Sequence, residues 1–343
     1  MTAAEVTSPR PETVPVPRAR PSGSGISVVI CACADERFEE LADAIRSIEA
    51  QTVPALETVV VVDHNPALAN RARERWRDVV VVENVDRRGV SASRNAGVAR
   101  SRGAIVAFLD DDAIAAPDWL ARMLGVYARD TVMAVGGDVA PLWQTGRPAW
   151  FPDEFGWVVG CSYTGLPDHP APVRNVIGAN MSFRRDVFAE IGGFDTAVGR
   201  VGRSPAGCDE TEFCIRARRR WRGRTIVYDP CVRVSHRVPA HRSSLAYFVS
   251  RCYGEGRSKA LVSELVGSRD ALSTEVGYAT RILPAGVVHG LRDAVGGDRS
   301  GLGRAATITA GLAATSAGFL AARVAGATLR RRTPPAPGAR CAS

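Results

Sequence analysis

The feature that most constrains the fold is an alternation of apolar runs and helix-like segments between residues 26 and 110. Such alternation is typical of a parallel sheet covered by helices on both faces. We therefore expect an α/β fold with a mostly parallel sheet flanked by helices. The apolar runs lie at 26–31, 58–62, 79–82 and 104–109, and the helix-like segments lie at 38–50, about 64–77 and 91–102.

Beyond Asp138 this alternation stops, and the chain reads as a mixture of shorter elements. We expect strands over 177–183, 226–228 and 232–235, helices over 185–191 and 208–221, and mostly helical chain over 243–329. Residues 1–24 and 330–343 are rich in proline and polar residues, which predicts disordered tails. The first of these has no apolar stretch of signal-peptide length.

The composition excludes several classes of chemistry. The formal charge is +8, yet Lys259 is the only lysine, so a lysine nucleophile and a P-loop lysine are both disfavoured. The eight cysteines are scattered and form no CxxC pair, which argues against a zinc ribbon or a thioredoxin-type site. We expect them to be reduced structural thiols, which places the protein in the cytosol.

Acidic residues follow the predicted strands, where parallel α/β sheets bind ligands. Glu36 lies beyond the first strand, Asp63 beyond the second and Asp110–Asp112 beyond the fourth. Alternate residues of an extended chain share a face, so Asp110 and Asp112 point together, and carboxylates of this kind suit Mg²⁺ or Mn²⁺. The other interpretation is a solvated turn before a helix. Three adjacent acids at the end of a buried strand are costly without a partner, which favours the metal-site interpretation.

A second acidic group opens the predicted helix over 208–221. Asp209, Glu210 and Glu212 can provide a general base, or they can simply stabilise a helix N-terminus through its dipole. Between the two acidic groups, residues 141–172 form a long segment rich in tryptophan, phenylalanine, glycine and proline. Its aromatic rings either stack on sugars or pack over the sheet, and the sequence leaves both interpretations open.

Two further segments have competing interpretations. Residues 216–257 contain eleven arginines and two acids, but no nucleic-acid recognition module is evident. We expect a solvated helix face or a site for an anionic acceptor or lipid headgroups, and no nucleic-acid partner. Residues 305–322 carry no charge and approach the length of a membrane span. They form a helix in peripheral membrane contact, a packed soluble helix or a true span, and Arg330–Arg332 would favour the cytoplasmic side.

Six segments, in this order, resemble family-two glycosyltransferases with the GT-A fold. They are SVVICA, VVVVDHNP, GVSASRNAG before FLDDD, GANMSFRRDVF before IGGFD, CDETEFCIR and VSHRVP, and they span about two thirds of the chain. The resemblance implies a GT-A domain over 25–240. The helical pattern beyond it predicts a C-terminal extension over 241–329, for which membrane contact is one of the interpretations given above.

The resemblance also implies roles for individual residues. It assigns the nucleoside-diphosphate donor, with UDP-sugars favoured, to Ala34, Glu36, Asp63, Arg94, Asn95, Asp110 and Asp111. It assigns a Mg²⁺ or Mn²⁺ ion to Asp112, Asp110 and His236, and the acceptor to Asn180 and Trp157. Glu210 matches the position of the general base of inverting enzymes, with Asp209 beside it as the alternative.

We therefore expect a metal-dependent inverting glycosyltransferase of the hexosyltransferase type that acts in cell-envelope synthesis. The segments WFPDEFGWVVGC and YGEGRSKA are similar to those of prokaryotic members that act on lipid-linked glycans. This indicates a glycan or lipid-linked acceptor and a cytoplasmic location at the inner face of the membrane. One alternative is a catalytically inactive relative that binds sugar nucleotides or glycans. A dinucleotide-dependent oxidoreductase is disfavoured, because no GxGxxG follows the first strand.

Overall fold

The computed structural model describes residues 23–202 and 206–332. The predicted tails over 1–22 and 333–343 lie outside the described residues. Gly23 and Ser24, assigned to the first tail, begin the first strand instead, and Arg330–Arg332 belong to the last helix.

One mixed sheet of nine strands forms the centre of the molecule, in the order β3-β2-β1-β4-β8-β6-β9-β5, with β7 paired to β9. The neighbours β3, β2, β1 and β4 are parallel, as the alternation predicts, whereas β8 runs antiparallel to both β4 and β6. The strands are β1 (Gly23–Ala32), β2 (Glu57–Asp63), β3 (Val80–Asn84), β4 (Gly103–Asp110), β5 (Ala113–Ala115), β6 (Val132–Trp143), β7 (Ala171–Pro172), β8 (Asn180–Arg184) and β9 (Thr225–Val238).

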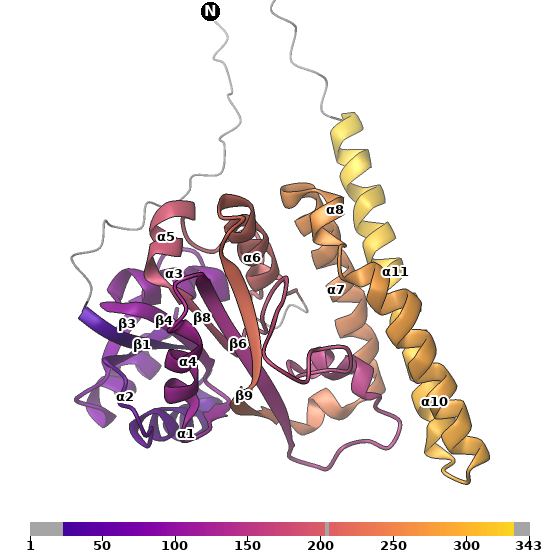
Figure 1. Ribbon diagram of the computed structural model, residues 1–343, viewed down its shortest axis with the longest axis horizontal. Helices are drawn as coiled ribbons and strands as arrows, with labels where there is room; N and C mark the ends of the chain where they lie inside the picture. Colours follow the sequence, from indigo (N-terminus) through magenta and orange to yellow (C-terminus); the bar gives the residue numbers. More distant parts are fainter. Residues whose placement is uncertain (1–22, 203–205, 333–343) are drawn as a thin grey trace, which may run out of the picture.

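Helices cover both faces of this sheet, and a group of C-terminal helices stands at one side of it (Figure 1). The longer helices are α1 (Phe38–Glu49), α2 (Pro66–Arg75), α3 (Val90–Arg100), α4 (Trp119–Tyr127), α5 (Arg185–Ile191), α6 (Asp209–Arg220), α7 (Leu245–Val266), α10 (Leu283–Val295) and α11 (Ser300–Arg332). The short ones are η1 (Asp35–Arg37), η2 (Asp153–Val159), η3 (Ala240–Ser243), α8 (Ser268–Ala271), α9 (Glu275–Gly277) and η4 (Tyr278–Ile282).

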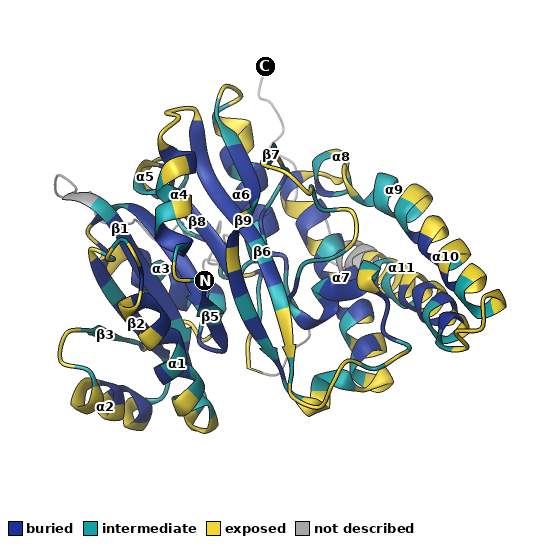
Figure 2. Cartoon of the chain, turned by 60° about the horizontal axis from the view of Figure 1, so that its bottom comes forward, coloured by how far each residue is buried: buried dark blue, intermediate teal, exposed yellow. Residues whose placement is uncertain are grey.

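Two apolar cores lie on the opposite faces of the sheet. Val60 and Val62 of β2 belong to one core, and Val59 and Val61 belong to the other, because side chains along a strand alternate between its faces. Both faces of the central strands are therefore buried, which explains why they read as continuous apolar runs (Figure 2).

The second half of the sheet differs from the sequence-based prediction. The two short strands expected over 226–228 and 232–235 are one strand, β9, whose register against β6 shifts opposite Gly137 and Asp138. Pro230 lies inside this irregularity and has no N–H to donate, so the sequence there reads as a break. In addition, β6 extends to Trp143, into the segment predicted to be a loop.

The C-terminal helices pack closely through glycines. A Cβ atom on Gly256 of α7 would lie 1.9 Å from the carbonyl oxygen of Thr315, and one on Gly318 of α11 would lie 2.0 Å from that of Tyr253. Since α7 lies between the sheet and α11, these two glycines set how closely α11 approaches the rest of the protein (Figures 1 and 2).

We predict that Gly256→Ala lowers stability by about 1–3 kcal/mol, because the added methyl group forces α7 and α11 apart. Thermal unfolding measures this. The matched control is Gly125→Ala on α4, where a Cβ would meet nothing within 4 Å, and we expect it to be neutral or stabilising by about 0.5–1 kcal/mol. Equal melting temperatures for Gly256→Ala and the unmodified chain would contradict the close packing.

Candidate active site

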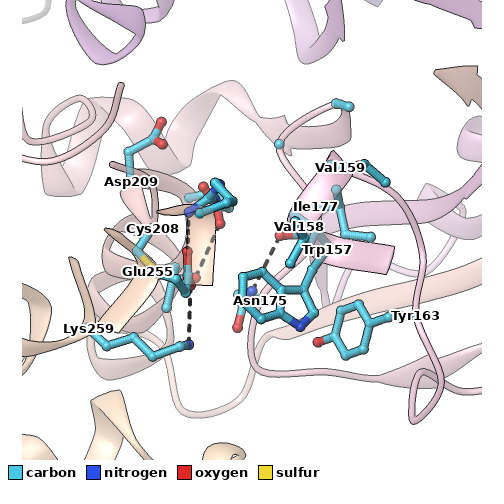
Figure 3. A pocket seen from close by; sticks show the side chains of 18 of the residues that line it. Trp157, Val158, Val159, Tyr163, Asn175, Ile177, Cys208, Asp209, Glu255 and Lys259 are labelled. Atoms are coloured by element: carbon cyan, nitrogen blue, oxygen red, sulfur yellow. Dashed lines mark hydrogen bonds and ion pairs between the residues drawn. The ribbon is translucent and has the colours of Figure 1, made fainter. Parts of the chain in front are cut away.

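A cavity of about 1150 Å³ lies beyond the carboxyl ends of β1, β2 and β4, between the sheet and the C-terminal helices. Its lining joins residues that are far apart in the sequence, among them Asp63, Asp112, Glu210 and Leu320. In its wider part, Glu255 and Lys259 of α7 lie on one side, with Trp157 and Tyr163 on the other (Figure 3). The two predicted acidic groups thus share one cavity.

Asp63 closes the narrow end of the cavity and is held by three donors. Asn84 Nδ2 lies 2.7 Å from Asp63 Oδ1, His64 Nδ1 lies 2.8 Å from the same oxygen, and the Gly89 N–H donates to Oδ2 at 3.0 Å. These contacts fix the carboxylate at the end of β2, beside the cavity.

The neighbouring loop after β1 borders the cavity. Cys33 and Arg37 line the cavity, whereas Ala34 and Glu36, which lie between them, are not among the described residues that line it. Donor contacts of Ala34 and Glu36 stay predictions.

Arg37, at the end of η1, pairs with the acids that follow β4. Its Nη2 atom lies 2.7 Å from Asp111 Oδ1 and also pairs with Asp112. Burial raises the pKa of Asp111 to about 7, although Arg37 opposes the shift. In contrast, His236 and Arg37 hold the pKa of Asp112 well below its usual range despite its burial. Adjacent carboxyl groups are thereby given different protonation behaviour.

The chain brings His236 to the same carboxylates through strand pairing. β5 follows Asp112 directly and pairs with β9, with Ala113 opposite His236. As a result, possible ligand atoms of Asp110, Asp112 and His236 all lie within 4.8 Å of one another. This is the predicted metal group.

The donor set of this group fits a divalent cation. Asp112 Oδ1 is buried and has no hydrogen-bond donor among the described residues, and His236 Nε2 lies 3.0 Å from it. One cation between these two atoms could take a ligand atom from each. Two carboxylates and one imidazole suit Mg²⁺ or Mn²⁺.

Arg94, predicted to contact the donor, joins the two acidic groups. It is buried on α3 and pairs through Nη1 with Asp209 Oδ2, while Nη2 lies 3.7 Å from Asp110 Oδ1. Nη2 also donates to the carbonyl of Gly178 at 3.3 Å. Arg94 also lines the cavity, so one guanidinium group links Asp110 and Asp209 at its wall.

The adjacent residues Asp209 and Glu210 have different surroundings. Cys208 adopts a left-handed φ of 72° just before α6, and its thiol donates to Glu255 at 3.0 Å. Asp209 is buried against Arg94, whereas Glu210 lines the cavity and forms no ion pair within the described chain. Burial and the nearby Asp209 raise the pKa of Glu210 to about 8. This is the carboxyl group better suited to take a proton.

Two residues with predicted ligand contacts have structural partners. Asn95 holds the loop after α5, since its amide donates to the carbonyl of Phe194 at 2.9 Å and accepts from the Phe194 N–H at 2.8 Å. Asn180 is fully buried, accepts from Trp119 Nε1 at 2.8 Å and donates to the carbonyls of Asp138 and Val232. Neither residue is among the described residues that line the cavity, and their contacts with nucleotide and acceptor stay predictions.

The packing interpretation of the aromatic segment holds for two of its residues, and the sugar-stacking interpretation stays a prediction for two others. Phe151 and Phe155 are buried and pack on Phe248 of α7, with ring centroids 5.8 and 5.1 Å apart. Trp157 and Tyr163 line the cavity, Trp157 donating to Tyr278 Oη at 3.2 Å. A contact of Trp157 with the acceptor stays a prediction.

The sequence did not show which positively charged side chains line the cavity. Arg37, Arg200, Arg242, Arg251 and Lys259 all line it, with Glu255 and Glu275 pairing to Lys259 at 3.4 and 2.6 Å. A signal was present in the arginine excess over 216–257 and in the one lysine, but nothing local distinguishes these arginines from the exposed ones on α6.

Comparisons with known proteins agree with this geometry. Residues 27–192 match the sequence profile of the family described as glycosyl transferase family 2. The chain is 38% identical over 244 residues to a glucosyl-dolichyl phosphate glucuronosyltransferase of Haloferax volcanii, covering 70% of this chain and 78% of that protein. It is 28% identical over 246 residues to the succinoglycan biosynthesis protein ExoM of Rhizobium meliloti, covering 68% and 75%.

A solved structure shares the fold. The mannosyltransferase PcManGT from Pyrobaculum calidifontis, in complex with GDP-Man and Mn²⁺, superposes with a TM-score of 0.54 at 20% identity. The alignment covers 87% of this chain and 89% of the other, so the C-terminal part is included in the likeness.

We predict that Asp112→Asn and His236→Ala each lower the affinity for Mn²⁺ at least tenfold, because each removes one ligand of the group. Titration of Mn²⁺ followed by electron paramagnetic resonance measures the free ion directly, without turnover. Asp118→Asn, at an exposed carboxylate before α4, is the control that keeps the affinity. Unchanged Mn²⁺ binding in both ligand variants would exclude this metal site.

Proposed function

Because the chain belongs to glycosyl transferase family 2 and has the GT-A fold, we propose that it transfers a sugar from a nucleoside diphosphate to a hydroxyl group, with inversion. The acceptor that we propose is a lipid-linked glycan. One observation carries this proposal. Asp110, Asp112 and His236, which suit a cation, line the same cavity as Glu210, a carboxyl group with a raised pKa and no cationic partner among the described residues.

The narrow end of the cavity is the proposed donor site. Asp63 would accept from the nucleotide base, for which we propose uracil, and the backbone from Gly89 to Ser93 lies beside it. A divalent cation held by Asp110, Asp112 and His236 would compensate the charge of the leaving diphosphate. We propose Mn²⁺ or Mg²⁺ in this role.

Glu210 is the proposed general base. Its carboxylate takes the proton of the acceptor hydroxyl, whose oxygen forms a bond to the anomeric carbon from the face opposite the leaving group. The bond from the anomeric carbon to the phosphate oxygen breaks, and its electron pair leaves with the diphosphate. Asp209 cannot do this while it is paired with Arg94.

The acceptor assignment rests on similarity together with the shape of the site. The relative from Haloferax volcanii is named for glucosyl-dolichyl phosphate, and its similarity covers most of both chains. The other candidate function, a binding protein without activity, needs a lost metal group or a lost base. The described residues include a group that could hold a metal ion and a carboxyl group, Glu210, in the same cavity, which favours the enzyme.

We predict that Glu210→Gln lowers kcat by about 10²–10⁴, the usual contribution of a general base, and keeps donor affinity. The assay incubates the full chain with a panel of nucleotide sugars, a lipid-linked acceptor and either Mn²⁺ or a chelator. Since a base must be deprotonated, kcat/KM should rise with pH through about 8 and then level off.

The matched control is Glu212→Gln, whose carboxylate pairs with Arg216 on the same helix. It should keep the alkaline rise. Near-normal turnover in Glu210→Gln would disprove the assignment of the base, and absence of transfer from every donor would disprove the function.

The location that we propose is the cytoplasmic face of a membrane. The seven described cysteines are free thiols, as expected in a reducing compartment. Within α11, Ser300–Ala325 is long and apolar enough to cross a membrane, with 28% of its most apolar window buried. Because α11 packs on α7 and α10 along this stretch, we propose peripheral contact rather than a span.

Exposed apolar residues support this contact. Val295 is 92% exposed at the end of α10, and Leu291 is 46% exposed one turn earlier. We predict that the double variant Leu291→Glu, Val295→Glu lowers sedimentation with anionic phospholipid vesicles at least threefold. Val85→Glu, at an exposed residue beyond β3, is the control. Equal sedimentation of all three proteins would exclude α10 as the contact.

A further inference from the structure

The cavity is larger than a donor alone requires. Its volume of about 1150 Å³ exceeds the roughly 300–1,000 Å³ of typical small-molecule sites. Beyond the carboxylates it continues past a group of arginines to the surface of α11. The composition of this extension indicates what occupies it.

The middle of the cavity is cationic. Arg200, Arg242 and Arg251 line it, and the nearby charges of Arg251 and Arg242, added to burial, lower the pKa of Arg200. Arg242 lies 3.9 Å from Asp112, and Arg251 pairs with Glu255 at 2.9 Å. Arg200 has no hydrogen bond or ion pair from its side chain among the described residues. Arginines that repel one another in one cavity favour an anion between them.

The position of this arginine group relates it to the acceptor. A Cβ on Gly207 would lie 2.9 Å from Arg251 Nη2, so this guanidinium stands beside the turn that leads to Glu210. The carbonyl of Arg200 accepts from the N–H of Val90 at 3.0 Å, which fixes its loop to the start of α3. An anion here would lie near the proposed base.

The outer end of the cavity is lined by one face of α11. Leu312, Thr315, Ser316, Phe319 and Leu320 line it at helical spacing i, i+3, i+4, i+7 and i+8. Ile282 and Leu283 face them from η4 and the start of α10. Leu320 is 63% exposed, so this apolar end reaches the protein surface.

We infer that the arginine group binds the phosphate of the acceptor lipid and that the apolar face of α11 binds the start of its hydrocarbon chain. This rests on the proposed function. Guanidinium groups match phosphate oxygens in geometry and charge, and an apolar exit beside them suits a single amphiphile. The donor phosphate is the competing occupant of the arginines, and the experiment separates the two.

The experiment measures binding by calorimetry to the full chain, with UDP and Mn²⁺ already bound. The probes are farnesyl phosphate below its micelle concentration, farnesol and inorganic phosphate. We expect farnesyl phosphate to bind at least tenfold more tightly than either of the others. Arg200→Gln should lower the affinity for farnesyl phosphate at least tenfold and leave the affinity for farnesol unchanged. Leu312→Asn should lower the affinity for both.

Arg218→Gln, at an exposed arginine of α6 away from the cavity, is the control and should change nothing. Binding of UDP and Mn²⁺ to Arg200→Gln shows that this variant is folded. The inference is overturned if Arg200→Gln lowers the affinity for UDP and not that for farnesyl phosphate. It is also overturned if farnesol and farnesyl phosphate bind with equal affinity. A failure of the proposed function is distinct, since it shows as absence of transfer by the unmodified chain.

Discussion

The arrangement of the site depends on the buried side chain of Arg94. It lies on α3 and contacts Asp209 at the start of α6 and Asp110 at the end of β4, which are about 100 residues apart in the chain. A buried guanidinium is costly unless carboxylates compensate it, and a buried carboxylate likewise needs a cation. This mutual requirement keeps the end of β4 and the start of α6 at one cavity.

The same requirement gives the acidic side chains of the site different partners and different pKa values. Asp209 is paired with Arg94. Asp111 is buried beside Arg37 with a raised pKa, and Asp112 stays charged between His236 and Arg37. Glu210 is left facing the cavity with a pKa raised to about 8. Carboxyl groups of similar chemistry thus acquire different properties because their neighbours and their burial differ.

The C-terminal helices complete the site as well as extending the fold. α7 contributes Arg251, Glu255 and Lys259, and α11 contributes Leu312, Phe319 and Leu320, so this part of the cavity exists only when these helices pack against the sheet. Close approach through Gly256 and Gly318 makes this packing possible. The cavity thus joins the carboxylates of the sheet to side chains of the C-terminal helices.

The sequence by itself determined the elements whose signals are local. Apolar periodicity located β1 to β4 and the helices between them, and position at strand and helix ends located Asp63, Asp110, Asp112 and Glu210. Only the tertiary structure decided that Asn95 and Asn180 hold loops and strands, that β9 is continuous through Pro230, and that Arg37 and Arg200 line the cavity. An arginine or an asparagine has the same local pattern whether it meets solvent, a distant carbonyl or a ligand, because its partner is chosen by the folding of residues far away in the chain.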